Sequence, residues 1–327
     1  MNSKILEQSG LSHYNADDFF AKRVRLRKGV ETVIWVHRQS GHGLLDPVEW
    51  PDESYYKEQY REEFSANSDG KKVQTDKHFQ IFKKINKKQF NLFSADLGPN
   101  TNFLEVGPSH GGIIDHVSRA GVKCYHVVEP NTEDAAYIRE KYPKSRVYNS
   151  LLEKTDLEKD CYDMVVSFEV LEHTLSPKTF LKNLNTCMKK GAALVLEVPN
   201  HDDVLLSCYN KDITYRDFYY HKAHIHYFTA KSLQDMCREC GFDGEVSSFL
   251  MYPFFNHVYW AQNHGPQPTA NAALSLPIPT SGETDTQKEI NSFYDNVERE
   301  YEKLINSKMV GDCLVFKGRK EWTDIQN

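Results

Sequence analysis

The segment Phe103–Gly112 constrains the fold more than any other part of the chain. Phe103 to Val106 predicts a short buried strand that carries one acid, Glu105. A glycine-punctuated turn follows, and a helical run begins at Ile113. A strand that breaks into such a turn and opens a helix is how α/β proteins hold an adenosine-bearing cofactor, because glycine lets the backbone approach the ligand closely. No Gly-Lys-Ser/Thr follows, which excludes a P-loop.

Alternating strands and helices follow this turn. Glu129 ends the next predicted strand and lies 24 residues after Glu105. An acid at this position hydrogen-bonds a ribose diol in such folds. The further predicted elements are a helix over Thr132–Tyr142, strands over 146–148, 162–168 and 193–198, and helices over Pro177–Lys189 and Ala230–Cys240. This alternation predicts an α/β fold with a mainly parallel sheet.

The spacing from Glu105 to Gly111, acid-x-Gly-x-Ser-x-Gly, resembles motif I of the class I S-adenosylmethionine (SAM) dependent methyltransferases. That family usually has a second glycine where Ser109 stands. Tyr162–His173 resembles its fourth-strand motif, which ends in Glu-x-apolar-Glu-His, and the matching motifs occur in order over about 100–250. The resemblance implies a Rossmann-like, seven-stranded mixed sheet that binds SAM, as in bacterial sugar and small-metabolite methyltransferases.

The resemblance also implies which residues contact the cofactor. Glu105, Gly107 and Gly111 would shape the turn around the methionine and sulfonium. The other expected contacts are Ser109 as a hydrogen-bond donor, Glu129 at the ribose, Ser150 and Leu151 beside adenine, and Phe168 and Glu169 behind the methionyl part.

Glu172, His173 and His224 are the candidate catalytic residues. Strand tips are the usual site in an open α/β sheet, and a histidine that titrates near neutrality suits removal of a hydroxyl proton. We expect His173 or His224 to be the base. The alternative for His173 is structural, since in the family's Glu-His pair this residue often only packs or bonds the backbone.

Glu169, Glu172, His173 and His224 are also chemically suited to a divalent metal. The set resembles the Glu-x-x-Glu-His…His site of small-RNA 2′-O-methyltransferases, in which a metal orients the terminal ribose diol. The same motif is frequent among metabolite methyltransferases without a metal, and the acidic chain lacks an obvious RNA-binding module. We therefore expect no metal, and name these four residues as the ligands if one binds.

Composition narrows the class of protein. The 327 residues carry a formal net charge of −6, which argues against a general nucleic-acid or membrane-surface binder. No apolar run is long enough to span a membrane, and the N-terminus lacks a signal-peptide core. Seven scattered cysteines fit reduced thiols, so a cytoplasmic protein is expected.

Three regions are expected: an N-terminal extension over 1–70 with a hairpin and a helix, a SAM-binding core over 71–262, and a linker, helix and last core strand over 263–327. The last strand, expected over Cys313–Lys317, would be antiparallel and lie between the fifth and sixth strands, as the resemblance implies. Candidate substrate contacts are Tyr56, Tyr60, Tyr220 and His226; the alternative for these aromatic residues is packing alone.

Three functions remain open. The first is in-line methyl transfer to a hydroxyl of a small metabolite or a sugar, which could be nucleotide-linked, with a His/Glu general base. The second is metal-assisted 2′-O-methylation of an RNA 3′ end. The third is a non-catalytic partner subunit, which the presence of Glu105 and Glu129 disfavours. Residues 1–70 could close over the substrate or form a homodimer contact.

Overall fold

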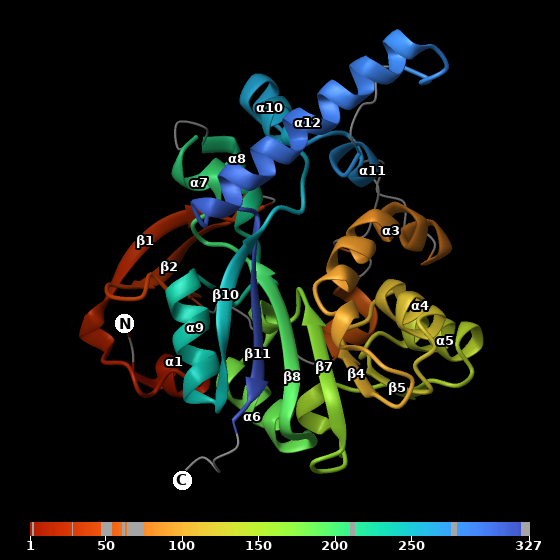
Figure 1. Cartoon of the computed structure of the whole chain (residues 1–327). Coiled ribbons are helices and arrows are strands. Elements are labelled where there is room, and N and C mark those ends of the chain that lie inside the picture. Colours follow the sequence, from red (N-terminus) through yellow and green to blue (C-terminus); the bar gives the residue numbers. More distant parts are fainter. Residues whose placement is uncertain are drawn as a thin grey trace.

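The computed structural model describes residues 1, 3–27, 29–46, 54–60, 63, 75–209, 213–275 and 280–321. Two sheets organise this part of the chain, one of seven strands and one of four (Figure 1). The described residues contain no helix that is both long and apolar enough to cross a membrane.

The seven-stranded sheet has the order β10-β11-β8-β7-β4-β5-β6. Its strands are β4 (Asn102–Val106), β5 (Cys124–Val128), β6 (Arg146–Tyr148), β7 (Tyr162–Phe168), β8 (Met188–Pro199), β10 (Phe242–Phe249) and β11 (Cys313–Lys320). The central strands pair in parallel, whereas β11 is antiparallel to both β8 and β10. The expected fold and the expected place of the last strand are thus confirmed, although β11 extends three residues beyond Lys317.

Alternate residues of the central strands face two separate apolar clusters, which explains their nearly continuous apolar sequences. In β8, Leu194 and Leu196 pack with residues of α6 and α9, whereas Ala193 and Val195 pack with residues of α3, α4 and α5. These helices are α3 (Thr75–Asn91), α4 (Gly112–Arg119), α5 (Thr132–Lys141), α6 (Pro177–Cys187) and α9 (Ala230–Glu239). The parallel strands are thereby covered on both faces.

Local signals set the helix boundaries. Ser176 caps α6, and Pro177 occupies its first turn, where a missing N–H costs nothing. Thr229 and Ser232 form a capping box that starts α9. The prediction for α6 ran too far, because Met188 already begins β8. Short 3₁₀ turns follow α3, β6 and β7; they are η3 (Ser94–Asp96), η4 (Leu152–Lys154) and η5 (Leu171–His173), respectively.

The N-terminal region builds the second sheet, in the order β1-β2-β3-β9. Its elements are α1 (Ser3–Gln8), η1 (Ala16–Asp18), β1 (Phe19–Arg25), β2 (Glu31–His37), β3 (Gly43–Leu45) and the core strand β9 (His226–Tyr227). The hairpin agrees with the expected one. The helix expected from Asp52 lies partly outside the described residues, and its described part is a π-helical turn, η2 (Tyr55–Gln59).

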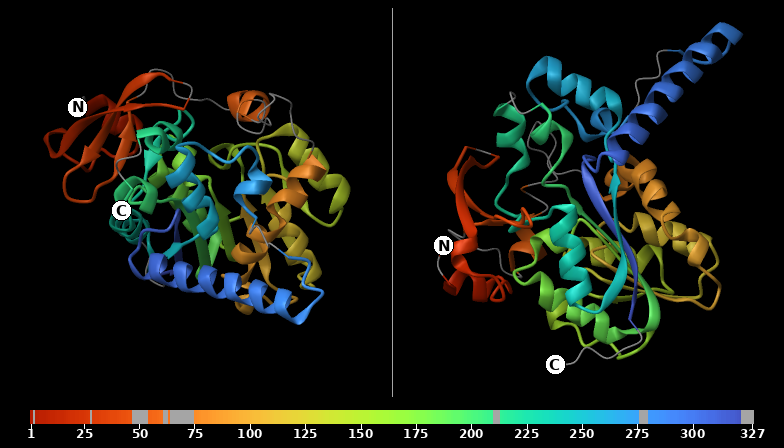
Figure 2. Two further views of the ribbon diagram at one scale, coloured as in Figure 1. Left: turned by 90° about the horizontal axis from the view of Figure 1, so that it is seen from above. Right: turned by 60° about the vertical axis from the view of Figure 1, so that its left-hand side comes forward.

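Helices near the carboxyl ends of the parallel strands complete the molecule (Figure 1). They are α7 (Val204–Ser207), α8 (Ile213–Tyr219), α10 (Phe254–Asn263), α11 (Ala270–Ala273) and α12 (Asp285–Ser307). Thr284 caps the last of these helices, which begins at Asp285. It extends away from the sheet (Figure 2) and leaves Ile290 and Leu304 exposed, so its apolar side chains are only partly covered.

Candidate functional site

The turn after β4 has a backbone that only small residues allow. Gly107 has φ 78° and Gly111 has φ 76°, both left-handed. A Cβ on Gly107 would collide with the Val170 side chain, which comes from the loop after β7. Gly111 is the N-cap residue of α4. The turn therefore packs directly against the loop after β7, and it ends at the start of a helix, where backbone N–H groups are available. The predicted close approach of this turn to a cofactor stays a prediction.

Glu129 ties this turn to the end of β5. One of its carboxylate oxygens accepts a hydrogen bond from the Ser109 backbone N–H (3.0 Å) and the other accepts one from the Asn131 N–H (2.7 Å). Glu105 lies nearby in β4, fully enclosed, and its Oε2 has no hydrogen-bond partner among the described residues. Burial, together with the charge of Glu129, raises the pKa of Glu105 well above its usual range.

Residues after β6 lie at the same edge of the large sheet as the glycine turn and Glu129, the edge formed by the carboxyl ends of the parallel strands. Ser150 and Leu151 are half-buried there, and the Ser150 hydroxyl donates to the Leu151 carbonyl (3.1 Å). Asn149, which the sequence did not single out, donates to the Glu129 carbonyl (2.9 Å). It thus fixes the loop that carries Glu129, a role that asparagine at a strand end does not reveal by itself.

A buried acid cluster lies where β7, β8 and β11 meet. Glu169, with φ 56°, accepts a hydrogen bond from the Cys313 thiol (3.6 Å), and Glu197 accepts one from the Gln89 amide (2.8 Å). Burial raises the pKa of Glu169 and of Glu197 well above the usual range of a carboxyl group, and repulsion from neighbouring carboxylates adds to this. Glu197 was missed, although an acid inside the apolar strand 193–198 is itself a signal. Phe168 lies directly before Glu169 and stacks on Phe93 (6.3 Å).

Glu172, His173 and His224 come together at the same edge, with one ligand-type atom from each within 4.8 Å of the others. Glu172 Oε1 lies 3.5 Å from His173 Nε2 and 3.8 Å from His224 Nε2. The Nδ1–H of His173 donates to the Ala223 carbonyl (2.9 Å), which turns Nε2 toward Glu172. The prediction that these three side chains share a site is supported by their positions.

Burial governs the protonation of this cluster. It raises the pKa of Glu172 to about 8, and neither carboxylate oxygen has a hydrogen-bond partner among the described residues. It also lowers the pKa of His224 well below its usual range, helped by repulsion from His221. The side chains of His173 and His224 remain 10% and 12% exposed, whereas that of Glu172 is 1% exposed. The imidazoles are therefore the groups that a substrate can reach, with the carboxyl group behind them.

The turn η2 contacts both the group of Glu172, His173 and His224 and the loop after β5. The Tyr56 hydroxyl donates to the His173 carbonyl (3.1 Å), and the Tyr60 ring centre lies 5.4 Å from that of His173. At the other end, the Lys57 carbonyl accepts a hydrogen bond from the Asn131 amide (3.1 Å). Tyr56 and Tyr60 thus lie beside the group of Glu172, His173 and His224, the histidine cluster, as a substrate contact requires.

Tyr220 and His226 lie elsewhere. Tyr220 is 0% exposed, and its hydroxyl contacts His201 Nε2 and Lys22 Nζ, both at 3.2 Å. His226 is 1% exposed and bonds His42 through Nδ1 (3.0 Å). Burial lowers its pKa to about 4. Both side chains are buried in contacts with the smaller sheet and the loops beside it, and neither is part of the cluster of Glu172, His173 and His224. Their contact with substrate stays a prediction.

Only three of the four candidate metal ligands gather in one cluster. The carboxylate of Glu169 groups instead with Glu197 and Cys313. Glu172, His173 and His224 alone would offer a metal two imidazoles and one carboxylate. That donor set suits several divalent transition metals.

Comparison with known proteins gives a family. A family model described as a methyltransferase domain matches residues 77–245, more than half of the chain. No curated protein matches the sequence. The matched segment contains Glu172, His173 and His224, together with Glu169 and Glu197 of the acid cluster, whereas Cys313 lies beyond it.

Many solved structures are similar in part. A chain of the complex between the Haloferax volcanii Trm112 methyltransferase activator and a methyltransferase has 13% identity and a TM-score of 0.49, covering 75% of this chain and 94% of that one. A SAM-dependent methyltransferase from Archaeoglobus fulgidus has 15% identity and a TM-score of 0.47, covering 73% and 94%. One from Thermotoga maritima has 17% identity and a TM-score of 0.43, covering 74% and 100%.

Proposed function

Because the chain belongs to the SAM-dependent methyltransferase family and uses SAM as its cofactor, we propose that it methylates a hydroxyl group of a small metabolite or of a sugar, which includes nucleotide-linked sugars. The observation that carries this proposal is the histidine-carboxyl cluster at the carboxyl edge of the sheet, beside the glycine turn. A hydroxyl acceptor must lose a proton during transfer, and this cluster offers groups that can take it.

The residues of the edge fit a cofactor that carries permanent positive charge. Gly107 lets the turn pass directly against the Val170 side chain, where a Cβ would collide, and Glu105 offers a buried carboxyl oxygen without a hydrogen-bond partner among the described residues. We assign the methionine end to Glu105, Gly107, Ser109 and Gly111, backed by Phe168 and Glu169, the ribose to Glu129, and adenine to Ser150 and Leu151. When bound, SAM supplies a methyl group on a sulfonium that is already a strong electrophile.

His224 or His173 then acts as the general base. Burial keeps His224 neutral at neutral pH, so its ring could accept the proton that the acceptor hydroxyl must lose during the transfer. Glu172 lies 3.8 Å from His224 and 3.5 Å from His173, and its pKa of about 8 leaves it largely protonated at neutral pH, so it acts as a neutral group that holds the two rings in place. Tyr56 and Tyr60 hold the acceptor side of the site, next to His173.

Turnover of a panel of hydroxylated metabolites and sugars tests this proposal. The product of SAM, S-adenosylhomocysteine, is measured for each compound with wild type, His173→Gln and His224→Gln. We expect one acceptor class to be methylated on oxygen, and one of the two variants to lose turnover while it still binds SAM. Methylation on nitrogen or carbon only, with both variants fully active, would contradict the proposal.

Metal-assisted transfer is the second candidate, favoured by the close approach of Glu172, His173 and His224. The acceptor would then be a vicinal diol such as the terminal ribose of an RNA. Chelator treatment separates the two candidates: the metabolite proposal predicts unchanged turnover, and the metal proposal predicts its loss and its recovery with added Mg²⁺ or Mn²⁺.

A further inference from the structure

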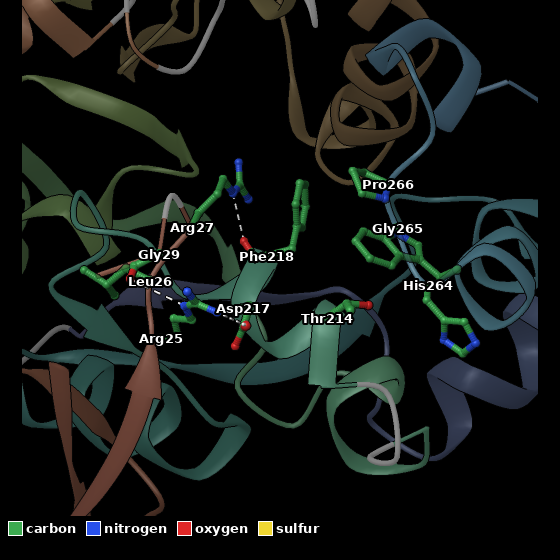
Figure 3. Close-up of a pocket in the computed structure, with 11 residues that line it drawn as sticks. Arg25, Leu26, Arg27, Gly29, Thr214, Asp217, Phe218, His264, Gly265 and Pro266 are labelled. Atoms are coloured by element: carbon green, nitrogen blue, oxygen red, sulfur yellow. Dashed lines mark hydrogen bonds and ion pairs between the residues drawn. The ribbon is translucent and has the colours of Figure 1, made fainter. Parts of the chain in front are cut away.

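A cavity of about 290 Å³ lies between the turn after β1, α8 and the end of α10 (Figure 3). Its lining combines two arginines, one carboxylate and aromatic rings: Arg25, Arg27, Asp217, Phe218, Trp260 and His264. Both α8 and α10 lie beyond the carboxyl ends of the parallel strands (Figure 1). The cavity is therefore on the same side of the large sheet as the histidine cluster.

Arg27 is held firmly at this cavity. Its Nε donates to the Phe218 carbonyl (2.8 Å), its backbone N–H donates to the Tyr220 carbonyl (2.6 Å), and its guanidinium carbon lies 3.8 Å from the centre of the Phe218 ring. Figure 3 shows the guanidinium standing beside that ring. The stacking fixes the plane of the guanidinium, and its two terminal nitrogens, which donate to no residue in the part of the chain that the structure describes, are available to another acceptor.

No carboxylate neutralises Arg27 among the residues that the structure describes. The nearby acid Asp217 pairs with Arg25 instead, at 4.0 Å. Burial lowers the pKa of the Arg27 guanidinium, and the groups that act in the opposite direction are tyrosines, with Tyr252 first, rather than carboxylates. A guanidinium that is partly removed from water without a counter-charge is costly, and an anionic ligand would remove that cost.

The charge of Arg27 also reaches the candidate base. It is among the causes that lower the pKa of His221 and of His224, so these groups are close enough to interact electrostatically. Tyr60, at the end of η2, is likewise near enough to influence Arg27. The cavity and the histidine cluster are therefore two parts of one region.

We propose that Arg27 and this cavity form a subsite for an oxyanion, a phosphate or a carboxylate group, carried by the methyl acceptor. The guanidinium binds two oxygens of the anion side by side, and Trp260 and Phe218 contact the apolar part next to it. The subsite fixes one end of the acceptor so that its hydroxyl reaches His224 or His173. Only the identification of the ligand with the acceptor rests on the proposed function; the anion site itself does not.

Calorimetry with two simple probes tests the subsite without knowledge of the acceptor. Inorganic phosphate and acetate are titrated separately, at constant ionic strength, into the full-length protein saturated with S-adenosylhomocysteine. We expect one of the two anions to bind saturably to the wild type, and its identity tells phosphate from carboxylate. Arg27→Gln should weaken this binding at least about tenfold, and Arg27→Lys should weaken it less, since the charge remains but the planar fork is lost.

Arg38→Gln is the matched control. Arg38 directly follows β2 of the smaller sheet, does not line the cavity, is exposed, and also faces an aromatic ring, that of Phe20 (5.4 Å). The variant should leave anion binding unchanged. The proposal is overturned if neither anion binds the wild type, or if Arg27→Gln and Arg27→Lys both bind as the wild type does. Should Arg27→Gln fail to fold, the wild type and Arg27→Lys still decide. Loss of S-adenosylhomocysteine binding by the wild type would instead contradict the cofactor site, a separate result.

Discussion

The two halves of the candidate site are built differently. The cofactor half consists of turns and loops that directly follow β4, β5 and β6, and its contacts are largely between side chains and nearby backbone groups. The acceptor half gathers side chains from η2, η5 and the segment before β9, which are far apart in sequence. The first half depends on local conformation, and the second depends on the packing of the whole molecule.

This difference leads to unequal effects of substitution. A change in the cofactor half should abolish cofactor binding, whereas a change in the acceptor half should spare cofactor binding and lower turnover. The same difference also governs what can be read from the sequence.

Gly107→Ala should have the largest effect. The new Cβ would meet the Val170 side chain, and the backbone at this position is left-handed. SAM affinity should therefore fall at least about 100-fold, which corresponds to a loss of about 2.7 kcal/mol of binding free energy. Gly121→Ala is the matched control, since Gly121 has φ 83° but open space around it. It should cost about 1 kcal/mol of stability and leave SAM binding intact. Calorimetry on both variants checks this, and equal SAM affinity in the two would remove the argument for a close approach at Gly107.

Replacement of the general base comes next. His224→Gln or His173→Gln, whichever carries the base, should lower kcat by about 10²–10⁴-fold without a change in SAM affinity. His13→Gln, which alters a half-exposed histidine of the N-terminal region, should not change kcat. If either cluster variant loses SAM binding as well, the two halves are not independent and the comparison fails.

Glu172 gives a pH-dependent effect on stability. Its pKa is about 8 in the folded protein and near 4.3 in the unfolded chain, so between these values the unfolded state binds fewer protons. The contribution of this group to stability is therefore full below pH of about 4 and decreases by about 1.4 kcal/mol per pH unit until about pH 8. Glu172→Gln should remove this slope. Denaturant unfolding at several pH values measures it; the same slope in wild type and variant would mean that Glu172 is ionised in the folded state.

Tyr56→Phe should have the smallest effect. It removes one hydrogen bond to the His173 carbonyl, worth about 1 kcal/mol, and should change kcat by less than about tenfold. Steady-state kinetics with saturating SAM measures this. An effect as large as that of the base replacement would place the Tyr56 hydroxyl in the chemistry rather than in support of His173.

The sequence predicted the local structure that carries the proposed cofactor residues, for a physical reason. The positions of Glu105, Gly107, Gly111 and Glu129 follow from strand–turn–helix units whose spacing is set by the chain itself. The antiparallel last strand and its place between the fifth and sixth strands could be predicted too, from the resemblance to the family.

The acceptor half could be predicted only in part. Glu172, His173 and His224 share a short motif and a later histidine segment, and they do meet. The burial of Tyr220 and His226 away from this cluster was not evident from the sequence, because His226 lies in β9, which pairs with β3 of the smaller sheet, and Tyr220 packs against the same sheet. Their contact with substrate stays a prediction. Arg27 gave no signal either, since its partners Phe218 and Tyr220 lie in α8 and directly after it, almost two hundred residues away.

Calorimetric titration of SAM into wild type, Glu129→Ala and Glu133→Ala tests the central claim most directly. Glu129 binds the glycine turn and the loop after β5 at once, whereas Glu133 is an exposed acid on the adjoining helix. The account predicts saturable SAM binding by the wild type and by Glu133→Ala, and its loss in Glu129→Ala. SAM binding that is equally strong in all three proteins would contradict the assignment of the cofactor to this edge of the sheet.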